Sequence, residues 1–260
     1  MSIFGSLRQM DRDIRMFGVR AALRNIGRLA SKRPFALDVP GFGSILVRRG
    51  DSDYETVVQA LGDREYAIGR ESVQARMFKR YGDILQSGHT PVVVDAGANI
   101  GAAALWFRSL YPEAAIVAIE PDPGNIAILK QNVRPFPSIK VMEAAVGSKP
   151  GHASLVAGDK SWGTQTIRAD HGCRIATIDE AFRSTLDGVP FLVKIDIEGF
   201  ERDLFTDNLE WLDQTFAVFI EPHDWMLPGE HSSRNFQKAF GKGEFEIFLR
   251  GQNLLYVRTS

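Results

Sequence analysis

The sequence predicts an α/β fold built on a doubly wound, mostly parallel sheet. From residue 91 onward, short apolar runs alternate with helix-like stretches, a rhythm typical of parallel strands with helices on both faces. The segment Val92–Gly101 (VVVDAGANIG) passes from a buried strand through a glycine-rich turn into a helix. Near the C-terminus, two apolar runs flank a turn at residues 251–253 and predict an antiparallel hairpin.

Apolar periodicity and the positions of Pro and Gly give the individual elements. Strands are expected at 92–95, 115–119, 139–142, 191–196 and 216–221, and helices at 99–110, 123–133 and 200–212. Upstream, a strand is expected at 44–48 and helices at 54–62 and 71–87. The segment 145–190 is less regular, with a polar loop from Gly158 to Gly172, a strand at 173–178 and a short helix from Asp179. The closing hairpin pairs 245–249 with 254–257.

The composition argues against several classes of protein. The 260 residues carry a formal net charge of −1, with 44% hydrophobic and 24% charged residues, so no strong overall charge favours nucleic acid as a partner. The single cysteine, Cys173, excludes an internal disulfide. No apolar run approaches the roughly 20 residues of a membrane span, and the N-terminus lacks the apolar core of a signal peptide. A cytoplasmic protein that does not bind nucleic acid is therefore expected.

Residues 1–50 are expected to form a basic helical arm with a connecting segment, and residues 51–260 the main domain. Eight Lys or Arg residues and only two Asp residues lie in 1–33, with apolar residues at roughly helical spacing. One interpretation is an amphipathic helix that contacts an anionic membrane surface or an acidic partner. The other, which we favour, is helices packed on the main domain with solvated arginines. Co-sedimentation with anionic liposomes that is lost from a version starting near residue 34 would support the first.

The glycine-rich turn predicts a nucleoside-binding site. A strand that turns sharply into a helix leaves backbone N–H groups facing one small volume, and Gly97 and Gly101 allow a ligand to approach that backbone. Asp95 and Asn99 place polar groups in the same turn. Glu120 closes the next apolar run 19 residues after Gly101, which is the spacing expected of a carboxylate that binds ribose hydroxyls. A ligand that carries a ribose is expected here.

A second polar cluster ends the strand in residues 189–199 (VPFLVKIDIEG). Strand alternation predicts one face with Phe191, Val193, Ile195 and Ile197, and an opposite face with Leu192, Lys194, Asp196 and Glu198. Burying a lysine and two acids is costly, but ligands bind at the carboxyl ends of such strands, so these groups are expected to meet a polar substrate. The alternative is a Lys194–Asp196 ion pair, with Glu198 capping a helix that begins at Gly199.

The next strand ends in the same way, with Glu221 and His223. Histidine titrates near neutrality and can take a proton from a hydroxyl. A lone histidine is often structural. Here, however, it follows a strand expected to neighbour the one that ends in Asp196, which favours a functional role.

Together these segments resemble the FkbM-type family of class I S-adenosylmethionine-dependent methyltransferases. The likeness covers roughly residues 60–225 and is carried by 94–101, 119–121, 144–147, 177–179, 192–201 and 220–223. Asn99 stands where the general class I pattern has glycine, and the FkbM type uses asparagine there. The resemblance implies a seven-stranded, Rossmann-like sheet with an antiparallel last strand. It also implies S-adenosyl-L-methionine as cofactor and O-methylation of a sugar, glycan or natural-product-like small molecule.

The resemblance further implies which residues form the site. The cofactor-binding set is Asp95, Gly97, Ala98, Asn99, Gly101, Glu120, Pro121, Ala144, Ala145 and Asp196. The chemistry of the charged strand ends makes His223 or Asp196 the candidate base, with Lys194 orienting or polarising. Glu198 and Glu221 are the candidates for binding the acceptor. No metal is predicted: Asp196, Glu198 and His223 have donor types that suit Mg²⁺ or Mn²⁺, but a sequence does not place them within ligand distance.

Two other functions fit parts of the pattern. The first is an NAD-dependent oxidoreductase, although this chain has Gly97-x-x-x-Gly101 in place of the usual Gly-x-Gly-x-x-Gly. The second is a non-catalytic nucleotide-binding or assembly module with a methyltransferase fold. The costly charged groups argue against it, because a binding-only site does not need them.

Overall fold

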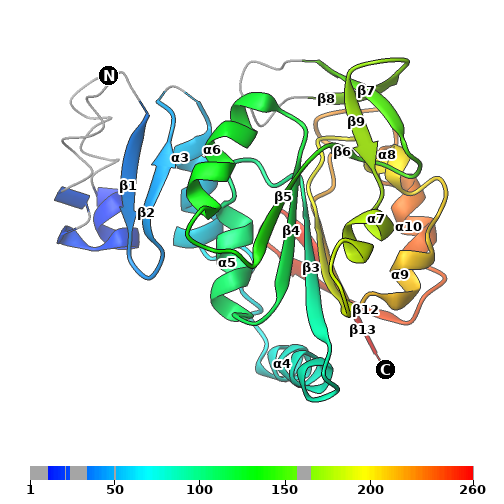
Figure 1. Cartoon of the computed structure of the whole chain (residues 1–260), viewed down its shortest axis with the longest axis horizontal. Helices are drawn as coiled ribbons and strands as arrows, with labels where there is room; N and C mark the ends of the chain where they lie inside the picture. Colours follow the sequence, from blue (N-terminus) through cyan, green and yellow to red (C-terminus); the bar gives the residue numbers. More distant parts are fainter. Residues whose placement is uncertain (1–10, 21, 24–33, 50, 157–164, 260) are drawn as a thin grey trace.

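A seven-stranded sheet forms the centre of the molecule (Figure 1). This computed structural model describes residues 11–20, 22–23, 34–49, 51–156 and 165–259. The strand order is β12-β13-β11-β10-β3-β4-β5, formed by Phe245–Arg250, Asn253–Arg258, Ala217–Ile220, Gly188–Ile195, Thr90–Ala96, Ala115–Glu120 and Ile139–Glu143. Neighbours from β5 to β11 pair in parallel, whereas β13 is antiparallel to both β11 and β12. The predicted α/β class, the seven strands and the terminal hairpin are confirmed.

Helices cover both faces of this sheet. On one side lie α5 (Ala102–Leu110) and α6 (Pro123–Val133). On the other lie α7 (Ile178–Arg183), α8 (Glu201–Leu204), α9 (Glu210–Gln214) and α10 (Arg234–Phe240). Strand β3 shows why: Val93 packs into the first core, while Val92 and Val94 pack into the second, so its apolar run is buried on both faces. In the described part of the chain, no helix has the length and apolar character to cross a bilayer.

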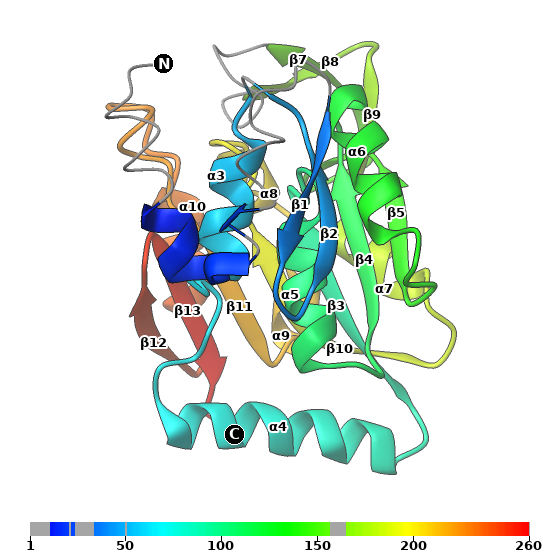
Figure 2. The same cartoon turned by 90° about the vertical axis from the view of Figure 1, so that its left-hand side faces the viewer.

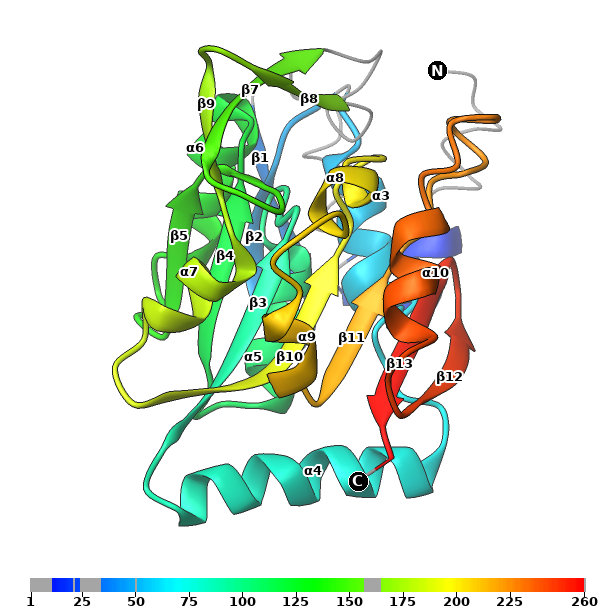
Figure 3. The same cartoon turned by 90° about the vertical axis from the view of Figure 1, so that its right-hand side faces the viewer.

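The longest helix, α4 (Glu71–Gln86), crosses the amino-terminal ends of the strands, at the bottom of Figures 2 and 3. It buries Val73, Met77 and Tyr81 in the same core as α5. The opposite edge, where β3, β4, β10 and β11 end, is thereby left for the loops that carry the polar residues.

The N-terminal region contributes a hairpin and a helix to the first core. Strands β1 (Phe35–Val39) and β2 (Gly43–Val47) pair antiparallel. Leu37 and Val47 are fully buried in the first core, where β2 packs on α6. The strand expected at 44–48 is confirmed, whereas β1 was not predicted. The helices expected at 54–62 and 71–87 are present as α3 (Asp53–Val57), η1 (Val58–Gly62) and α4.

Part of the basic arm is helical. Residues 11–17 form a helix, and Asp13 is buried against the hydroxyl of Tyr54. Most of the arginines that suggested a membrane-binding face, at 8, 24, 28 and 33 together with Lys32, lie outside the described residues. Contact of the arm with a membrane or an acidic partner therefore stays a prediction.

The segment 145–190 contains a second sheet that was not predicted. Strands β6 (Ala145–Val146), β9 (Cys173–Ala176), β7 (Gly151–Val156) and β8 (Gln165–Ala169) pair in that order, above the carboxyl ends of the main strands in Figures 1 and 3. The expectation of a polar loop from Gly158 to Gly172 was wrong over β8. That strand is half exposed and lacks an apolar run, so it gave no periodic signal.

Two further expectations were wrong in detail. The alternation predicted for β10 fails at Phe191, which packs against Tyr81 and Tyr111 in the first core while Val193 and Ile195 face the second. A register shift between Pro190 and Leu192 explains this, because a bulge reverses the facing of the residues before it. The helix expected at 200–212 is two short helices, α8 and α9, separated by a turn in which Asn208 has φ +53°.

Candidate active site

A cavity of about 390 Å³ opens at the carboxyl ends of β3, β4, β10 and β11. It brings together most of the residues expected from the sequence: Gly97, Ala98, Asn99, Glu120, Pro121, Ala145, Lys194, Asp196, Glu198, Glu221 and His223. These residues come from segments far apart in the chain. They meet because parallel strands end at the same edge of the sheet.

Three expected cofactor-binding residues do not line the cavity. Asp95 is fully buried and faces Lys194. Gly101 precedes α5 with φ +92°, and a Cβ there would lie 2.7 Å from the Leu129 side chain, so this glycine serves close packing. Ala144 is buried in the second core. All three are placed to support the wall of the cavity from behind.

Backbone contacts hold the glycine-rich turn in place and leave no room for a side chain at Gly97. Gly97 has φ +81°, and a Cβ on it would lie 1.8 Å from the carbonyl oxygen of Asp196. The N–H groups of Gly97 and Ala98 both donate to the carbonyl oxygen of Ile119, at 3.0 and 2.9 Å. The turn is therefore pinned between the ends of β10 and β4.

Asn99, the next residue of this turn, carries an unsatisfied acceptor. It has φ +49°, in the left-handed region that asparagine tolerates better than most side chains. Its side-chain Oδ1 is buried and makes no hydrogen bond with any residue that the structure describes. Because buried polar atoms are rarely left without partners, this oxygen is available to a ligand donor.

Glu120 is buried and almost saturated with hydrogen bonds. Its Oε2 accepts the backbone N–H of Asn99 at 2.8 Å, and its Oε1 accepts from Asp122 N and Asn125 Nδ2 at 3.0 and 3.2 Å. A carboxylate offers about four acceptor positions, so one remains, on Oε2. Burial raises the pKa of Glu120 to about 7, and the three donors offset this only in part.

Arg48 supports Glu120 from outside the cavity. Its guanidinium donates to Asn125 Oδ1 at 2.6 Å and forms a bidentate pair with Asp53 at 3.0 and 2.7 Å. Asn125 in turn donates to Glu120. Neither Arg48 nor Asn125 was expected from the sequence, because no local pattern links residues 77 positions apart.

Lys194 is 2% exposed and contacts three protein groups. Its Nζ lies 2.7 Å from the carbonyl oxygen of Gly97, 3.2 Å from Asp95 Oδ1 and 3.3 Å from Asp196 Oδ2. Burial opposes its charge, but the carboxylates of Asp95 and Asp196 hold the pKa of Lys194 well above its usual value. The Lys194–Asp196 ion pair that the sequence offered as an alternative is present, and Lys194 contacts Asp95 as well.

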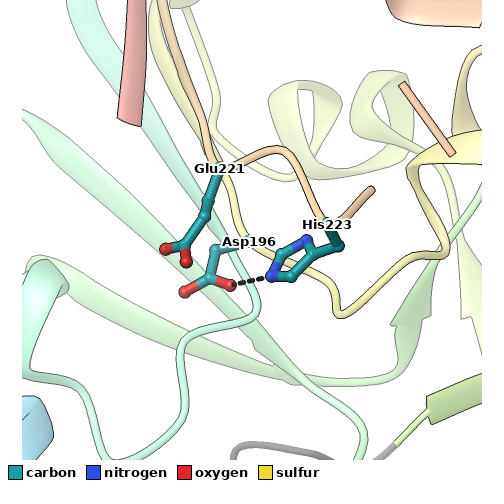
Figure 4. A group of neighbouring side chains, drawn as sticks. All are labelled: Asp196, Glu221 and His223. Carbon is teal, nitrogen blue, oxygen red and sulfur yellow. Dashed lines mark ion pairs between the residues drawn. The ribbon is translucent and has the colours of Figure 1, made fainter. Parts of the chain in front are cut away.

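His223 is the most enclosed polar group at the far end of the cavity. Its Nδ1 lies 3.0 Å from Oε1 of Glu201, which is itself fully buried. Its Nε2 faces Glu198 Oε2 at 3.5 Å and Asp196 Oδ1 at 3.6 Å; Figure 4 shows the ring turned toward Asp196. Burial opposes the charged ring, but the hydrogen bond and charge of Glu201, with the charges of Asp196 and Glu198, raise the pKa of His223 to about 10.

Two glutamates complete this polar end. Burial, followed by the charge of Asp196, raises the pKa of Glu198 and of Glu221 to about 8. Strand β10 ends at Ile195, and Glu198 lies beyond it with φ +53°, so the expectation that Glu198 continues the strand face was wrong. The alternative role as a helix cap is not observed either, because α8 begins at Glu201 without a side-chain cap.

The rim adds residues outside the set of site residues expected from the sequence. Glu65 lines the cavity and accepts from Asn253 Nδ2 at 3.1 Å. Glu55 and Thr166 line it from α3 and β8, and Trp225 lies at its edge with 62% of its surface exposed. The cavity is therefore rich in carboxylates, and Trp225 adds an exposed aromatic ring.

Comparison with known proteins identifies the family. The methyltransferase FkbM domain matches residues 95–232, which is more than half of the chain. The chain is 27% identical over 190 residues to the 2-O-methyltransferase NoeI of Sinorhizobium fredii (strain NBRC 101917 / NGR234), covering 63% of this chain and 76% of that protein. It is 29% identical over 131 residues to the methyltransferase sdnD of Sordaria araneosa, covering 45% and 47%.

Among solved structures, a putative caffeoyl-CoA O-methyltransferase from Staphylococcus aureus aligns with a TM-score of 0.39 and 10% identity, over 78% of this chain and 90% of that one. The domain match confirms the resemblance noted from the sequence, and the oxidoreductase alternative was wrong. The matched range contains the glycine-rich turn, Glu120 and the charged ends of β10 and β11. The chain is a methyltransferase of the FkbM domain family.

Proposed function

We propose that the protein is an S-adenosyl-L-methionine-dependent O-methyltransferase that acts on a hydroxyl of a sugar, glycan or natural-product-like small molecule. The observation that carries the proposal is one continuous cavity with two chemically different ends. Asn99 and Glu120 lie at one end, and Asp196, Glu221 and His223 at the other. A methyl donor and a polar acceptor can then meet inside it.

The residues at the first end fit the donor. The buried Asn99 Oδ1 lacks a hydrogen-bond partner among the described residues, and it suits a donor such as the ammonium group of the methionine moiety. The remaining acceptor position on Glu120 suits a ribose hydroxyl. Pro121 and Ala145 line the neighbouring wall and would flank the adenine. When bound, the cofactor supplies an electrophilic methyl group on a positively charged sulfur.

The protein's own task is to align the acceptor oxygen and to remove its proton. Methyl transfer forms a C–O bond as the C–S bond breaks, and the hydroxyl proton must pass to a nearby group. We assign this role to Asp196, because its side chain is 26% exposed to the cavity while that of His223 is 2% exposed. His223, oriented by Glu201, faces this carboxylate with its Nε2 at 3.6 Å from Oδ1.

Charge favours a neutral or cationic acceptor. Glu55, Glu65, Glu198 and Glu221 all line the cavity, and whichever of them are ionised would repel a phosphorylated substrate. With pKa values of about 8, Glu198 and Glu221 add this repulsion mainly above neutral pH. Oxygen as the methyl acceptor is supported by the name of the relative NoeI, a 2-O-methyltransferase at 27% identity. A neutral polyol such as a sugar satisfies both considerations.

Two measurements test the proposal. Calorimetry is expected to detect one S-adenosylhomocysteine per chain and no NAD. Incubation with donor carrying a labelled methyl group, and with neutral sugars, oligosaccharides and sugar phosphates, is expected to label a neutral acceptor as an O-methyl ether, identified by NMR. Cofactor binding without transfer to any acceptor would favour the non-catalytic module, and absence of cofactor binding would contradict the proposal.

A further inference from the structure

The acceptor end of the cavity has the composition and spacing of a metal site. Asp196 follows β10, and Glu221 and His223 follow β11. One ligand atom from each lies within 4.8 Å of the other two, and Figure 4 shows the three side chains converging. We infer that Asp196, Glu221 and His223 bind a divalent cation of the Mn²⁺ and Mg²⁺ class. The sequence alone predicts no metal, because chain spacing does not supply these distances.

The spacing suits an octahedral ion after a small closure of the side chains. With ligands at about 2.1 Å, neighbouring donor atoms lie about 3 Å apart and opposite ones about 4.2 Å. Two carboxylate oxygens and one imidazole nitrogen are hard-to-intermediate donors, which Mn²⁺ accepts readily. Three protein ligands leave positions for water or for acceptor oxygens.

The orientation of His223 is a separate observation that points to a ligand. The side chain is 2% exposed, and its only hydrogen bond within the described chain is from Nδ1 to Glu201. Nε2, turned into the cluster, is 3.5 Å or more from the nearest carboxylate oxygens, which is longer than a hydrogen bond. A histidine that binds a metal characteristically uses its other ring nitrogen to donate to a carboxylate in this way.

Glu201 fixes the orientation of the His223 ring. It is fully buried, and its Oε1 also accepts the backbone N–H of Ile197 at 3.1 Å. The carboxylate is thereby fixed to the loop that follows β10. It directs the ring of His223 before any ion arrives, which reduces the cost of assembling the site.

Glu221 is the ligand with the fewest competing contacts. In the part of the chain that the structure describes, its carboxylate makes no hydrogen bond and no ion pair, although it lines the cavity. Asp196 pairs with Lys194 through Oδ2 and turns Oδ1 toward His223. One oxygen of each carboxylate is thus available to a cation.

The local charges also favour a cation. Asp95, Asp196, Glu198 and Glu221 lie around this end of the cavity, together with Glu201. Lys194 is shared between the first two. The ring of His223 is a further positive charge while its Nε2 carries a proton, and an ion bound at Nε2 would replace that proton. Carboxylates gathered in a poorly hydrated place need compensating positive charge. A divalent ion would supply it at the centre of the group.

The role of the ion in methyl transfer rests on the proposed function, whereas its binding does not. A cation lowers the pKa of a hydroxyl that reaches it, so a weaker base suffices. With Asp196 acting as a ligand, the hydroxyl proton passes instead to Glu198, whose Oε2 lies 3.5 Å from the same imidazole nitrogen.

The test is binding of Mn²⁺ to chelator-treated protein, followed by electron paramagnetic resonance. One Mn²⁺ per chain is expected, and Glu221→Gln should weaken binding at least tenfold because it removes a ligand without breaking a hydrogen bond. Asp83→Asn, an exposed carboxylate on α4, is the matched control and should leave the affinity unchanged. Equal binding by wild type and Glu221→Gln, or no binding above nonspecific levels, would overturn the inference.

A second measurement needs no variant. Pulsed resonance on the Mn²⁺-loaded wild type should show coupling to one imidazole nitrogen, and a spectrum without nitrogen coupling would also overturn the inference. Calorimetry with S-adenosylhomocysteine on the same sample separates the two proposals. Cofactor binding without a Mn²⁺ site would contradict the metal site and leave the proposed function intact. A Mn²⁺ site without cofactor binding would support the metal site and contradict the proposed function.

Discussion

The ammonium group of Lys194 donates to the carbonyl oxygen of Gly97 across 2.7 Å. This bond joins β10 to the glycine-rich turn after β3. Lys194 also forms ion pairs with Asp95, in β3, and with Asp196, which follows β10. Lys194 thus makes one hydrogen bond, to the carbonyl oxygen of Gly97, and two ion pairs, with Asp95 and Asp196. We therefore propose that Lys194 acts as a positioning residue that fixes the cavity wall.

Replacing Lys194 by Met is expected to destabilise the fold by about 3–5 kcal/mol, because Asp95 would remain buried without its partner. Urea denaturation measures this. Lys79→Met removes an exposed pair with Asp83 and should cost no more than about 1 kcal/mol. Similar losses for the two variants would show that the buried pair has no special role.

Gly97→Ala is expected to weaken S-adenosylhomocysteine binding at least tenfold. The added Cβ would meet the Asp196 carbonyl oxygen at 1.8 Å, so the turn must move away from β10. Gly88→Ala provides the control, because Gly88 has φ +79° but open space around it. It should incur only the conformational cost of about 1 kcal/mol and leave the affinity intact, as measured by calorimetry.

The main sheet could be predicted because its strands have strong local signals. Val92, Val93 and Val94 predict burial on both faces, and Lys194 and Asp196 mark the strand end that meets solvent and ligand. β8 was missed because it is half exposed and carries few apolar residues. β1 has buried apolar residues at alternate positions but is only five residues long and lies between Pro34 and Pro40. The sheet face of Phe191 was predicted wrongly because a bulge within a run of apolar residues cannot be recognised from the sequence.

The site was predictable as a set of residues but not as a set of contacts. Asp95 and Gly101 belong to the same motif as Gly97, yet they support the wall from behind. Glu201 and Arg48 act through other residues, so only the folded chain shows their partners. The roles assigned to the residues at the cavity stay predictions.

The affinity for S-adenosylhomocysteine is expected to rise with pH around neutrality. Burial raises the pKa of Glu120 to about 7, and only the ionised carboxylate keeps all its acceptor positions for a ribose hydroxyl. The ionised fraction rises about tenfold from pH 6 to pH 8, and the affinity should follow. Glu120→Gln should bind more weakly and lose this dependence. An unchanged pH profile in the variant would show that another group is responsible.

Ionisation of Glu120 is expected to lower the stability of the folded protein, although it raises the affinity for S-adenosylhomocysteine. Because its folded-state pKa is raised above the ordinary value of 4.5, its contribution to folding is fully present below about pH 4.5 and is lost as pH rises through 7. The wild type should therefore lose stability relative to Glu120→Gln between these limits. Urea denaturation at pH 5 and pH 8 measures the difference.

His223→Gln is expected to lower turnover at least tenfold while S-adenosylhomocysteine affinity stays within about twofold. His223 lies at the acceptor end of the cavity, away from Asn99 and Glu120, so its loss should affect acceptor alignment and not cofactor binding. Steady-state kinetics with an acceptor found in the labelling experiment, together with calorimetry, checks both parts. Unchanged turnover would remove His223 from the mechanism.

Arg48→Lys is expected to weaken cofactor binding severalfold although Arg48 does not line the cavity. The guanidinium holds Asn125 and Asp53 at the same time, and a lysine ammonium does not reproduce that planar, bidentate geometry. Asn125 would then lose the contact that directs its amide toward Glu120. Calorimetry with S-adenosylhomocysteine measures the effect, and Arg76→Lys, at a partly exposed pair with Glu246, is the control. Equal affinities for the two variants would show that Glu120 is held in place without the N-terminal hairpin.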